Sequence, residues 1–247
     1  ACAAAGALPF GPIAADQRFT LKRPSTAIYG EAKFKATEDF SITVGLRYTW
    51  DKVKFKNGRT ILYALDGTTP AVGLVPYSNP YNAALPAVNQ SNSKGALTGR
   101  IVLDYKIAPD ILAYASYSRG YRSGTFNGLA YQDISQVYFV DPEKVNAYEG
   151  GLKTRFFDRR LQINLAGFYY DYGKQQIAQI IGATSFLRSA NGRVFGAEAE
   201  LEAQPFENLH INASLGLLSS KYTGNSTSAA DPANTTININ GNPFPNA

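Results

Sequence analysis

Apolar residues fall on every second position in four stretches of the chain, and each stretch follows a short turn that holds an acidic residue. Those acidic residues are Asp39, Asp110, Asp158 and Glu207. Alternation with a period of two places successive side chains on opposite faces of a β-strand. The pattern therefore predicts a repeated antiparallel hairpin with one apolar face and one polar face.

The same alternation, followed along the whole chain, predicts eight strands. They cover approximately residues 26–35, 40–53, 93–106, 111–119, 144–156, 161–172, 192–203 and 209–222. Strands in soluble proteins average about five or six residues, whereas a tilted strand needs roughly 9–11 residues to cross a bilayer. The length of these runs favours strands that span a membrane.

The connections between the predicted strands are strongly unequal. Residues 35–39, 106–110, 157–160 and 204–208 form tight turns, and the alternate connections, 54–92, 120–142 and 173–189, are long and rich in Gly, Pro, Asn, Ser and Tyr. Short turns at one end and long loops at the other are typical of outer-membrane barrels. Long loops of this kind are uncommon in compact soluble domains. We therefore expect an all-β fold, an antiparallel up-and-down transmembrane β-barrel.

The chain divides into three parts on this interpretation. Residues 1–24 are expected to be an extracellular-side loop or lead-in, residues 25–222 the barrel strands, and residues 223–247 an extracellular loop that stops before a further strand. A helical span is excluded, because no run of about 20 apolar residues occurs. Aromatic residues concentrate near both ends of the strands, which predicts two girdles at the membrane boundaries.

Charged residues fit the polar face of such a wall. Glu198, Glu200 and Glu202 alternate on one strand, and we expect them to pair with Lys153 or Arg155 on nearby strands rather than to form a cation site. The formal net charge is +5, but Lys and Arg are dispersed among Asp and Glu. The chain therefore has no stripe of basic residues of the kind that binds nucleic acid.

The sequence offers no catalytic constellation. His210 is the only histidine and lies on the polar face of its strand near Asn212 and Ser214. Cys2 is far from it, and zinc needs three or four protein ligands. We expect no enzyme activity, no metal site and no cofactor.

Three segments carry a specific resemblance: residues 114–127 (YASYSRGYRSGTFN), 141–172 (DPEKVNAYEGGLKTRFFDRRLQINLAGFYYDY) and 196–222 (GAEAELEAQPFENLHINASLGLLSSKY). Together they resemble the barrel of TonB-dependent outer-membrane receptors, and residues 25–52 look like an earlier hairpin of the same barrel. The resemblance implies a 22-stranded barrel, of which this chain would supply roughly eight to ten strands. It also implies an N-terminal plug domain and a TonB-contacting segment. Neither is found in this sequence, so we expect an internal piece of a larger receptor.

The resemblance implies active uptake of a scarce ligand, such as a ferric siderophore, across the outer membrane of a Gram-negative bacterium. The implied partners are outer-membrane lipid and lipopolysaccharide, the missing plug domain and remaining barrel strands, TonB, and the ligand. A passive porin-like or structural outer-membrane barrel is the alternative. A short loop folded inward as a constriction would support that alternative.

Ligand contacts are expected in the long extracellular loops, where aromatic and basic side chains gather. Aromatic side chains in loops also pack against one another, so each residue is a candidate only. The candidates are Tyr63, Tyr77, Tyr81, Phe126, Tyr131, Tyr138, Phe186 and Arg188.

Overall fold

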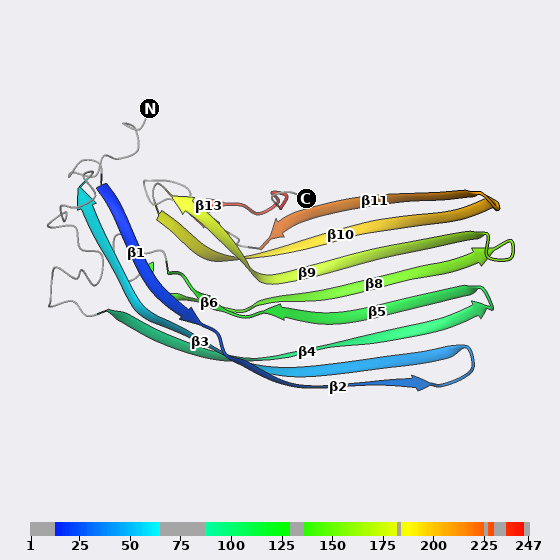
Figure 1. Cartoon of the computed structure of the whole chain (residues 1–247), viewed down its shortest axis with the longest axis horizontal. Helices are drawn as coiled ribbons and strands as arrows, with labels where there is room; N and C mark the ends of the chain where they lie inside the picture. Colours follow the sequence, from blue (N-terminus) through cyan, green and yellow to red (C-terminus); the bar gives the residue numbers. More distant parts are fainter. Residues whose placement is uncertain are drawn as a thin grey trace, which may run out of the picture.

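The computed structural model describes residues 13–64, 87–128, 136–181, 184–224, 227–229 and 236–244. These residues form one curved, nine-stranded antiparallel sheet that does not close on itself (Figure 1). In spatial order its strands are β1 (Ile13–Lys22), β3 (Phe40–Ala64), β4 (Val88–Ala108), β5 (Ile111–Arg122), β8 (Glu143–Phe156), β9 (Leu161–Ile181), β10 (Thr184–Phe206) and β11 (Leu209–Thr223), with β2 (Ser25–Lys35) also beside β3. Among the described residues, no helix has the length and apolar character needed to cross a membrane.

The eight predicted strands are confirmed, and one further strand, β1, precedes them. The lead-in predicted for residues 1–24 is wrong over Ile13–Lys22, because β1 pairs with the far half of β3 while β2 pairs with the near half. The two strands follow one another along the same edge of β3 and are separated at Arg23 and Pro24. A proline interrupts the ladder there, since it has no N–H to donate.

Parts of two predicted long loops are strand. β3 continues to Ala64, β4 begins at Val88, and β9 and β10 stay paired as far as Ile181 and Thr184. The Gly-, Asn- and Ser-rich composition suggested loops in these regions. Ladder hydrogen bonds to a neighbouring strand override such local preferences, which are weak in β-sheets.

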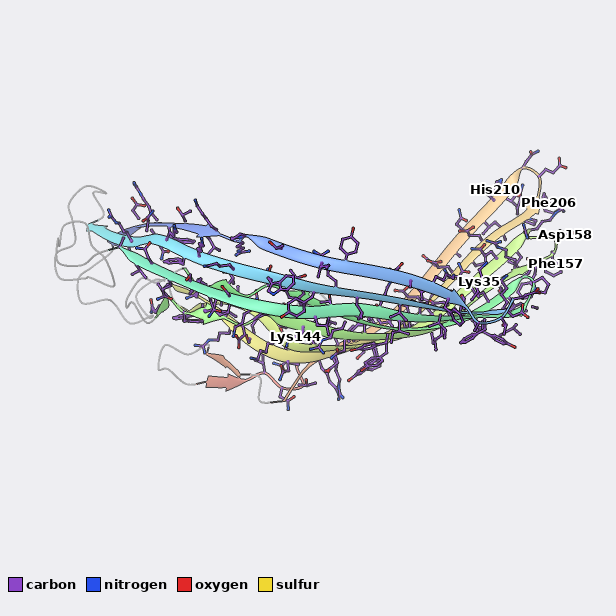
Figure 2. The ribbon with its side chains drawn as sticks, turned by 90° about the horizontal axis from the view of Figure 1, so that it is seen from below. Lys35, Lys144, Phe157, Asp158, Phe206 and His210 are labelled. Carbon is purple, nitrogen blue, oxygen red and sulfur yellow. The ribbon has the colours of Figure 1, made fainter. Side chains whose placement is uncertain are left out.

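The four tight turns lie at one end of the sheet, as predicted. Figure 2 shows Lys35, Phe157, Asp158, Phe206 and His210 together at that end, away from Lys144. The β8–β9 turn is the most unusual of the four, because its residues Phe157, Asp158 and Arg159 all have positive φ angles of 53°, 52° and 68°. We call this the tight-turn end and the opposite one the long-connection end.

The strand register confirms the two faces. Val44 lies opposite Ile101, and Leu165 lies between Leu152 and Ala199, so apolar positions form continuous rows across the strands. Near the long-connection end one such row is aromatic, and it joins Tyr117, Tyr148, Tyr169 and Phe195. Large apolar side chains on this face are exposed, as a lipid-facing surface requires.

The polar face holds cross-strand ion pairs, but not the predicted ones. The predicted pairing of the β10 glutamates with β8 is wrong. Arg155 instead donates from Nε to Gln162 Oε1 at 3.2 Å, the Lys153 ammonium lies over the Tyr114 ring, and Glu200 accepts from Asn164 Nδ2 at 3.3 Å. β9 separates β8 from β10 by two strand spacings, about 10 Å, so residues of β9 take the intervening contacts.

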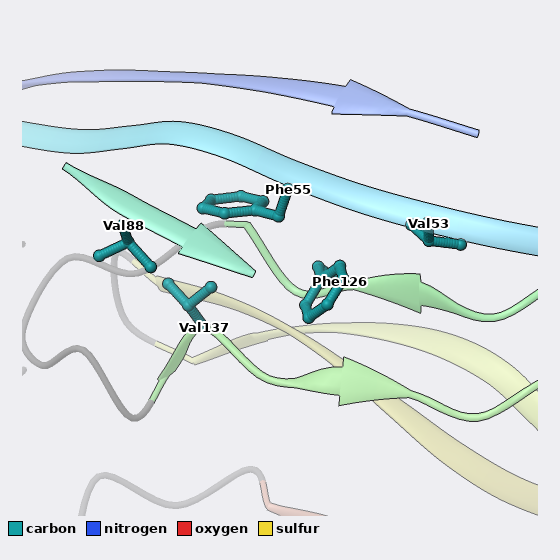
Figure 3. Packing of buried hydrophobic residues seen from close by; sticks show 5 residues of the cluster. All are labelled: Val53, Phe55, Val88, Phe126 and Val137. Atoms are coloured by element: carbon teal, nitrogen blue, oxygen red, sulfur yellow. The ribbon is translucent and has the colours of Figure 1, made fainter. Parts of the chain in front are cut away.

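The long connection between β5 and β8 folds back onto the polar face. It contains the two-residue strands β6 (Thr125–Phe126) and β7 (Phe139–Val140), which pair as a small hairpin. Phe126 and Val137 pack there against Val53 and Phe55 of β3 (Figure 3). Val88 of β4 completes the cluster, in which every member is less than a tenth exposed. This cluster anchors the β6–β7 hairpin to β3 and β4.

The chain after β11 also folds back onto the sheet. β12 (Thr227–Ala229) pairs with β13 (Thr236–Asn238), and the following residues return to β11, where the Tyr222 N–H donates to Asn242 O at 2.9 Å. The Phe244 ring then lies 4.7 Å from the Tyr222 ring. Part of the predicted loop over residues 223–247 is therefore packed against the wall.

Candidate ligand-binding site

A cavity of about 460 Å³ lies at the long-connection end, between the β6–β7 hairpin, β9 and the start of β10. A volume of this size is within the range of small-molecule sites, about 300–1,000 Å³. Its lining includes Tyr138, Phe139, Asp141, Lys174, Phe186 and Arg188. We call it the hairpin pocket.

Asn127 holds the hairpin against β10. Its side chain is 3% exposed, donates from Nδ2 to Gln136 O at 2.7 Å, and accepts from the Leu187 N–H at 3.2 Å. Its own N–H donates to Tyr138 O at 2.9 Å. An asparagine side chain both donates and accepts, so this one residue joins two segments that are distant in sequence.

Glutamine and arginine side chains attach the hairpin to the neighbouring strands. Gln90 Nε2 donates to Val137 O at 3.3 Å, and Arg23 donates to Thr125 Oγ1 at 2.8 Å. Gln176 Nε2 donates to the carbonyl oxygens of Ser123 and Asp141. The glutamine contacts satisfy backbone carbonyls that would otherwise be costly to bury.

Tyr138 reaches across the hairpin pocket to β10. Its hydroxyl donates to Leu187 O at 2.8 Å. Burial raises the pKa of this hydroxyl, although the nearby Arg188 charge opposes part of the rise. The phenol therefore stays protonated at neutral pH and remains a hydrogen-bond donor.

Lys174 reaches the hairpin pocket from a bulge in β9. Its φ is 56°, its N–H donates to Asn191 Oδ1, and the β9–β10 register shifts between Ala190 and Gly192. Bulges often redirect a side chain next to a functional site. Here the Lys174 ammonium lies 2.6 Å from the carboxylate of Asp141.

Asp141 is shared by two cations. Besides Lys174, the Lys94 ammonium lies 3.6 Å from its carboxylate. The hydrogen bond from Lys174 is the main reason that the pKa of Asp141 is lowered. The carboxylate is ionised at neutral pH, and its negative charge is already matched by lysine.

Arg188 is the remaining cation of the pocket lining. Its guanidinium lies over the Phe186 ring, with 5.7 Å from Cζ to the ring centroid. Its Nε is buried and has no hydrogen-bond partner among the described residues. Within the part of the chain that the structure describes, no carboxylate forms an ion pair with Arg188.

The structure brings three of the eight ligand candidates together, since Tyr138, Phe186 and Arg188 all line the hairpin pocket. Phe126 is instead 7% exposed and packs in the hydrophobic cluster. Tyr63 lies in β3 opposite Ala14. Tyr77, Tyr81 and Tyr131 lie outside the described residues.

Sequence reasoning missed Asn127, Asp141, Lys174 and Gln176. Each belongs to a stretch that its composition marked only as loop or loop boundary, and the contacts join residues as far apart as Asn127 and Leu187. The one local signal was Gly173 directly before Lys174, since glycine often marks a bulge in a strand.

Comparison with solved structures shows proteins of similar fold. The ferric yersiniabactin uptake receptor FyuA from Yersinia pestis matches with a TM-score of 0.67 and 18% identity over 86% of this chain and 29% of the receptor. The siderophore receptor PiuA from Acinetobacter baumannii matches with a TM-score of 0.64 and 20% identity over 92% of this chain and 30% of the receptor. The copper transporter OprC gives a TM-score of 0.59 and 16% identity over 81% of this chain and 30% of the transporter.

These identities establish the fold only, and the chain spans less than a third of the length of each of these proteins. The family described as TonB dependent receptor-like, beta-barrel, matches residues 4–247. This match agrees with the two-faced antiparallel sheet, the tight turns at one end and the long connections at the other. The chain therefore belongs to the TonB-dependent receptor family and forms part of its outer-membrane β-barrel.

Proposed function

We propose that this chain is the barrel part of an outer-membrane receptor that takes up a scarce ligand, such as a ferric siderophore, with energy supplied through TonB. The hairpin pocket is the observation that carries the proposal. It lies at the long-connection end, is built from segments fixed to the wall, and presents Tyr138, Phe186 and Arg188 to one space. The ligand would first meet the receptor there.

The functions of the structural neighbours support uptake but leave the ligand open. One is a ferric yersiniabactin uptake receptor, one is a siderophore receptor and one is a copper transporter. On this proposal the chain lies in the outer membrane of a Gram-negative bacterium. Lipid and lipopolysaccharide cover its apolar face, a plug domain and further strands complete the barrel, and TonB acts on the plug.

We also propose that the chain binds and conducts but does not catalyse. His210 is exposed on β11 beside the Glu207–Asn208 turn. His210 is at the tight-turn end (Figure 2). The hairpin pocket lies at the long-connection end. We assign His210 a structural role in the barrel wall.

Uptake in cells tests the transport proposal. Cells expressing the full-length receptor are given a panel of iron-labelled ferric siderophores that differ in charge, with and without a functional TonB system. We expect uptake of at least one member only when TonB is present, and weaker binding by the Phe186→Ala and Tyr131→Ala variants. Normal binding by both variants, with uptake still dependent on TonB, would remove these residues from the contact surface and leave the transport proposal standing.

A passive porin is the second candidate, because one specific observation favours it. The β5–β8 connection folds onto the polar face, where it could narrow a passage. Undiminished uptake without TonB would support the porin and exclude the receptor. Family membership favours the receptor.

A further inference from the structure

Among the described residues, the hairpin pocket contains one cation that forms no ion pair. Lys174 and Lys94 both pair with the carboxylate of Asp141, so the negative charge of Asp141 is already neutralised without Arg188. The pocket lining includes two positively charged residues, Lys174 and Arg188, and one negatively charged residue, Asp141. Its net charge is positive, and the excess is located at Arg188.

The geometry of Arg188 restricts what can bind it. The Phe186 ring lies against the guanidinium and limits its orientation, and the buried Nε–H has no acceptor in the described part of the chain. An unpaired buried donor is costly, and the cost is removed by an acceptor that enters with the ligand. Nε and one terminal nitrogen of an arginine point in the same direction, which matches the two oxygens of a carboxylate.

The rest of the lining favours an aromatic body behind that carboxylate. Tyr138, Phe139 and Phe186 supply three rings to the pocket, and their faces and edges suit a planar apolar group. The Tyr138 hydroxyl is already engaged with Leu187 O, so it adds little polar recognition of its own. The polar selectivity of the pocket rests mainly on Arg188.

We infer that the hairpin pocket selects ligands bearing an aromatic carboxylate, which Arg188 binds through two parallel hydrogen bonds while the pocket rings contact the aromatic part. This inference rests on the proposed function, because it names the ligand class of the same site. It makes Arg188 the residue that determines specificity. Neutral amide analogues of the same shape bind more weakly, because they leave the positive charge unmatched and offer one acceptor oxygen where a carboxylate offers two.

The test uses small probes on the purified full-length receptor in detergent. Ligand-observed NMR measures binding of benzoate, of its neutral analogue benzamide, and of cyclohexanecarboxylate, which keeps the charge without the ring. We expect benzoate to bind at least about tenfold more tightly than benzamide, as loss of a charge-assisted pair predicts. Cyclohexanecarboxylate should bind more weakly than benzoate. Equal binding of benzoate and benzamide, or no benzoate binding, would overturn the inference without any variant.

Variants then locate the effect. Arg188→Gln should abolish the preference for benzoate over benzamide, and Arg188→Lys should keep only part of it, because an ammonium cannot form the two-pronged pair. Arg193→Gln is the matched control, since Arg193 lies on the same strand outside the pocket lining. An unchanged preference in Arg188→Gln places the anion site elsewhere and refutes the inference.

The two proposals fail in different ways. Uptake that depends on TonB, combined with no preference for benzoate in the purified receptor, defeats the ligand class alone. A clear preference for benzoate, combined with uptake that does not need TonB, defeats the proposed transport mechanism and leaves the anion site standing.

Discussion

Glu31 and Arg100 form a two-pronged ion pair across β3, although they belong to the strands on either side of it. Arg100 donates from Nε and Nη2 to the two carboxylate oxygens at 2.8 and 2.9 Å. Both residues lie opposite Gly45 of β3. A Cβ added to Gly45 would lie 2.9 Å from Glu31 Oε2, so the glycine leaves the space in which the pair meets.

The Glu31–Arg100 pair should couple β2 to β4 measurably. Both side chains are about half exposed, so water screens the pair and we expect a coupling free energy of about 0.5–1 kcal/mol. A double-mutant cycle with Glu31→Gln and Arg100→Gln, read from denaturant unfolding of the full-length protein in lipid vesicles, measures it. Gly45→Val should remove most of the coupling, and a coupling unaffected by Gly45→Val would show that the glycine is not needed.

Arginine on the apolar face should destabilise the inserted protein more than arginine on the polar face. Val44, Ile101 and Leu165 lie on the apolar face, where an arginine near the bilayer midplane costs about 2–4 kcal/mol. Folding into lipid vesicles measures this cost. Thr43→Arg and Asn164→Arg, on neighbouring positions of the same strands, are the controls. Equal tolerance on both faces would mean that the apolar face does not meet lipid.

Asn127→Ala should loosen the β6–β7 hairpin. The change leaves the carbonyl of Gln136 and the N–H of Leu187 without their partner, and each such buried loss costs about 1–3 kcal/mol. Hydrogen exchange should speed up at the amide N–H groups of Leu187 and of residue 127, which donate to Asn127 Oδ1 and to Tyr138 O, with little change at the tight-turn end. Asn208→Ala, in the β10–β11 turn, is the matched control. Unchanged protection at Leu187 would contradict the role given to Asn127.

Acidification should weaken the Asp141–Lys174 contact. The pKa of Asp141 is lower in the folded protein than in the unfolded chain, mainly because Lys174 donates to its carboxylate. Its stabilising contribution is therefore complete above the unfolded pKa of about 4 and is lost as the pH falls through the lower folded pKa. Unfolding followed between neutral pH and pH 2 should show a pH dependence that Asp141→Asn reduces. Asp158→Asn, in the Phe157–Arg160 turn, should leave this dependence as it was; an equal reduction in both variants would assign it to general charge effects.

Much of the wall can be read from the sequence because alternation is a local property. The period-two pattern around Val44 and Leu165 assigned both faces, since one register slip would turn the whole apolar set toward water. The acidic tight turns located one end of the sheet in the same way. The ligand candidates Tyr138, Phe186 and Arg188 were also found locally, as aromatic and basic residues in long connections.

The hairpin pocket and the cross-strand pairs were decided by tertiary structure. The alternation that placed Glu198, Glu200 and Glu202 on one face could not say which strand lies between them and Lys153, and β9 proved to take the intervening contacts. Phe126 looked like a ligand contact, but the backward fold of the β5–β8 connection buries it against Phe55. The meeting of Asp141 with Lys174 depends on a bulge and on a contact across 33 residues. Side-chain periodicity records which face a residue occupies, whereas contacts between distant segments depend on how the whole sheet bends and on where the connections return.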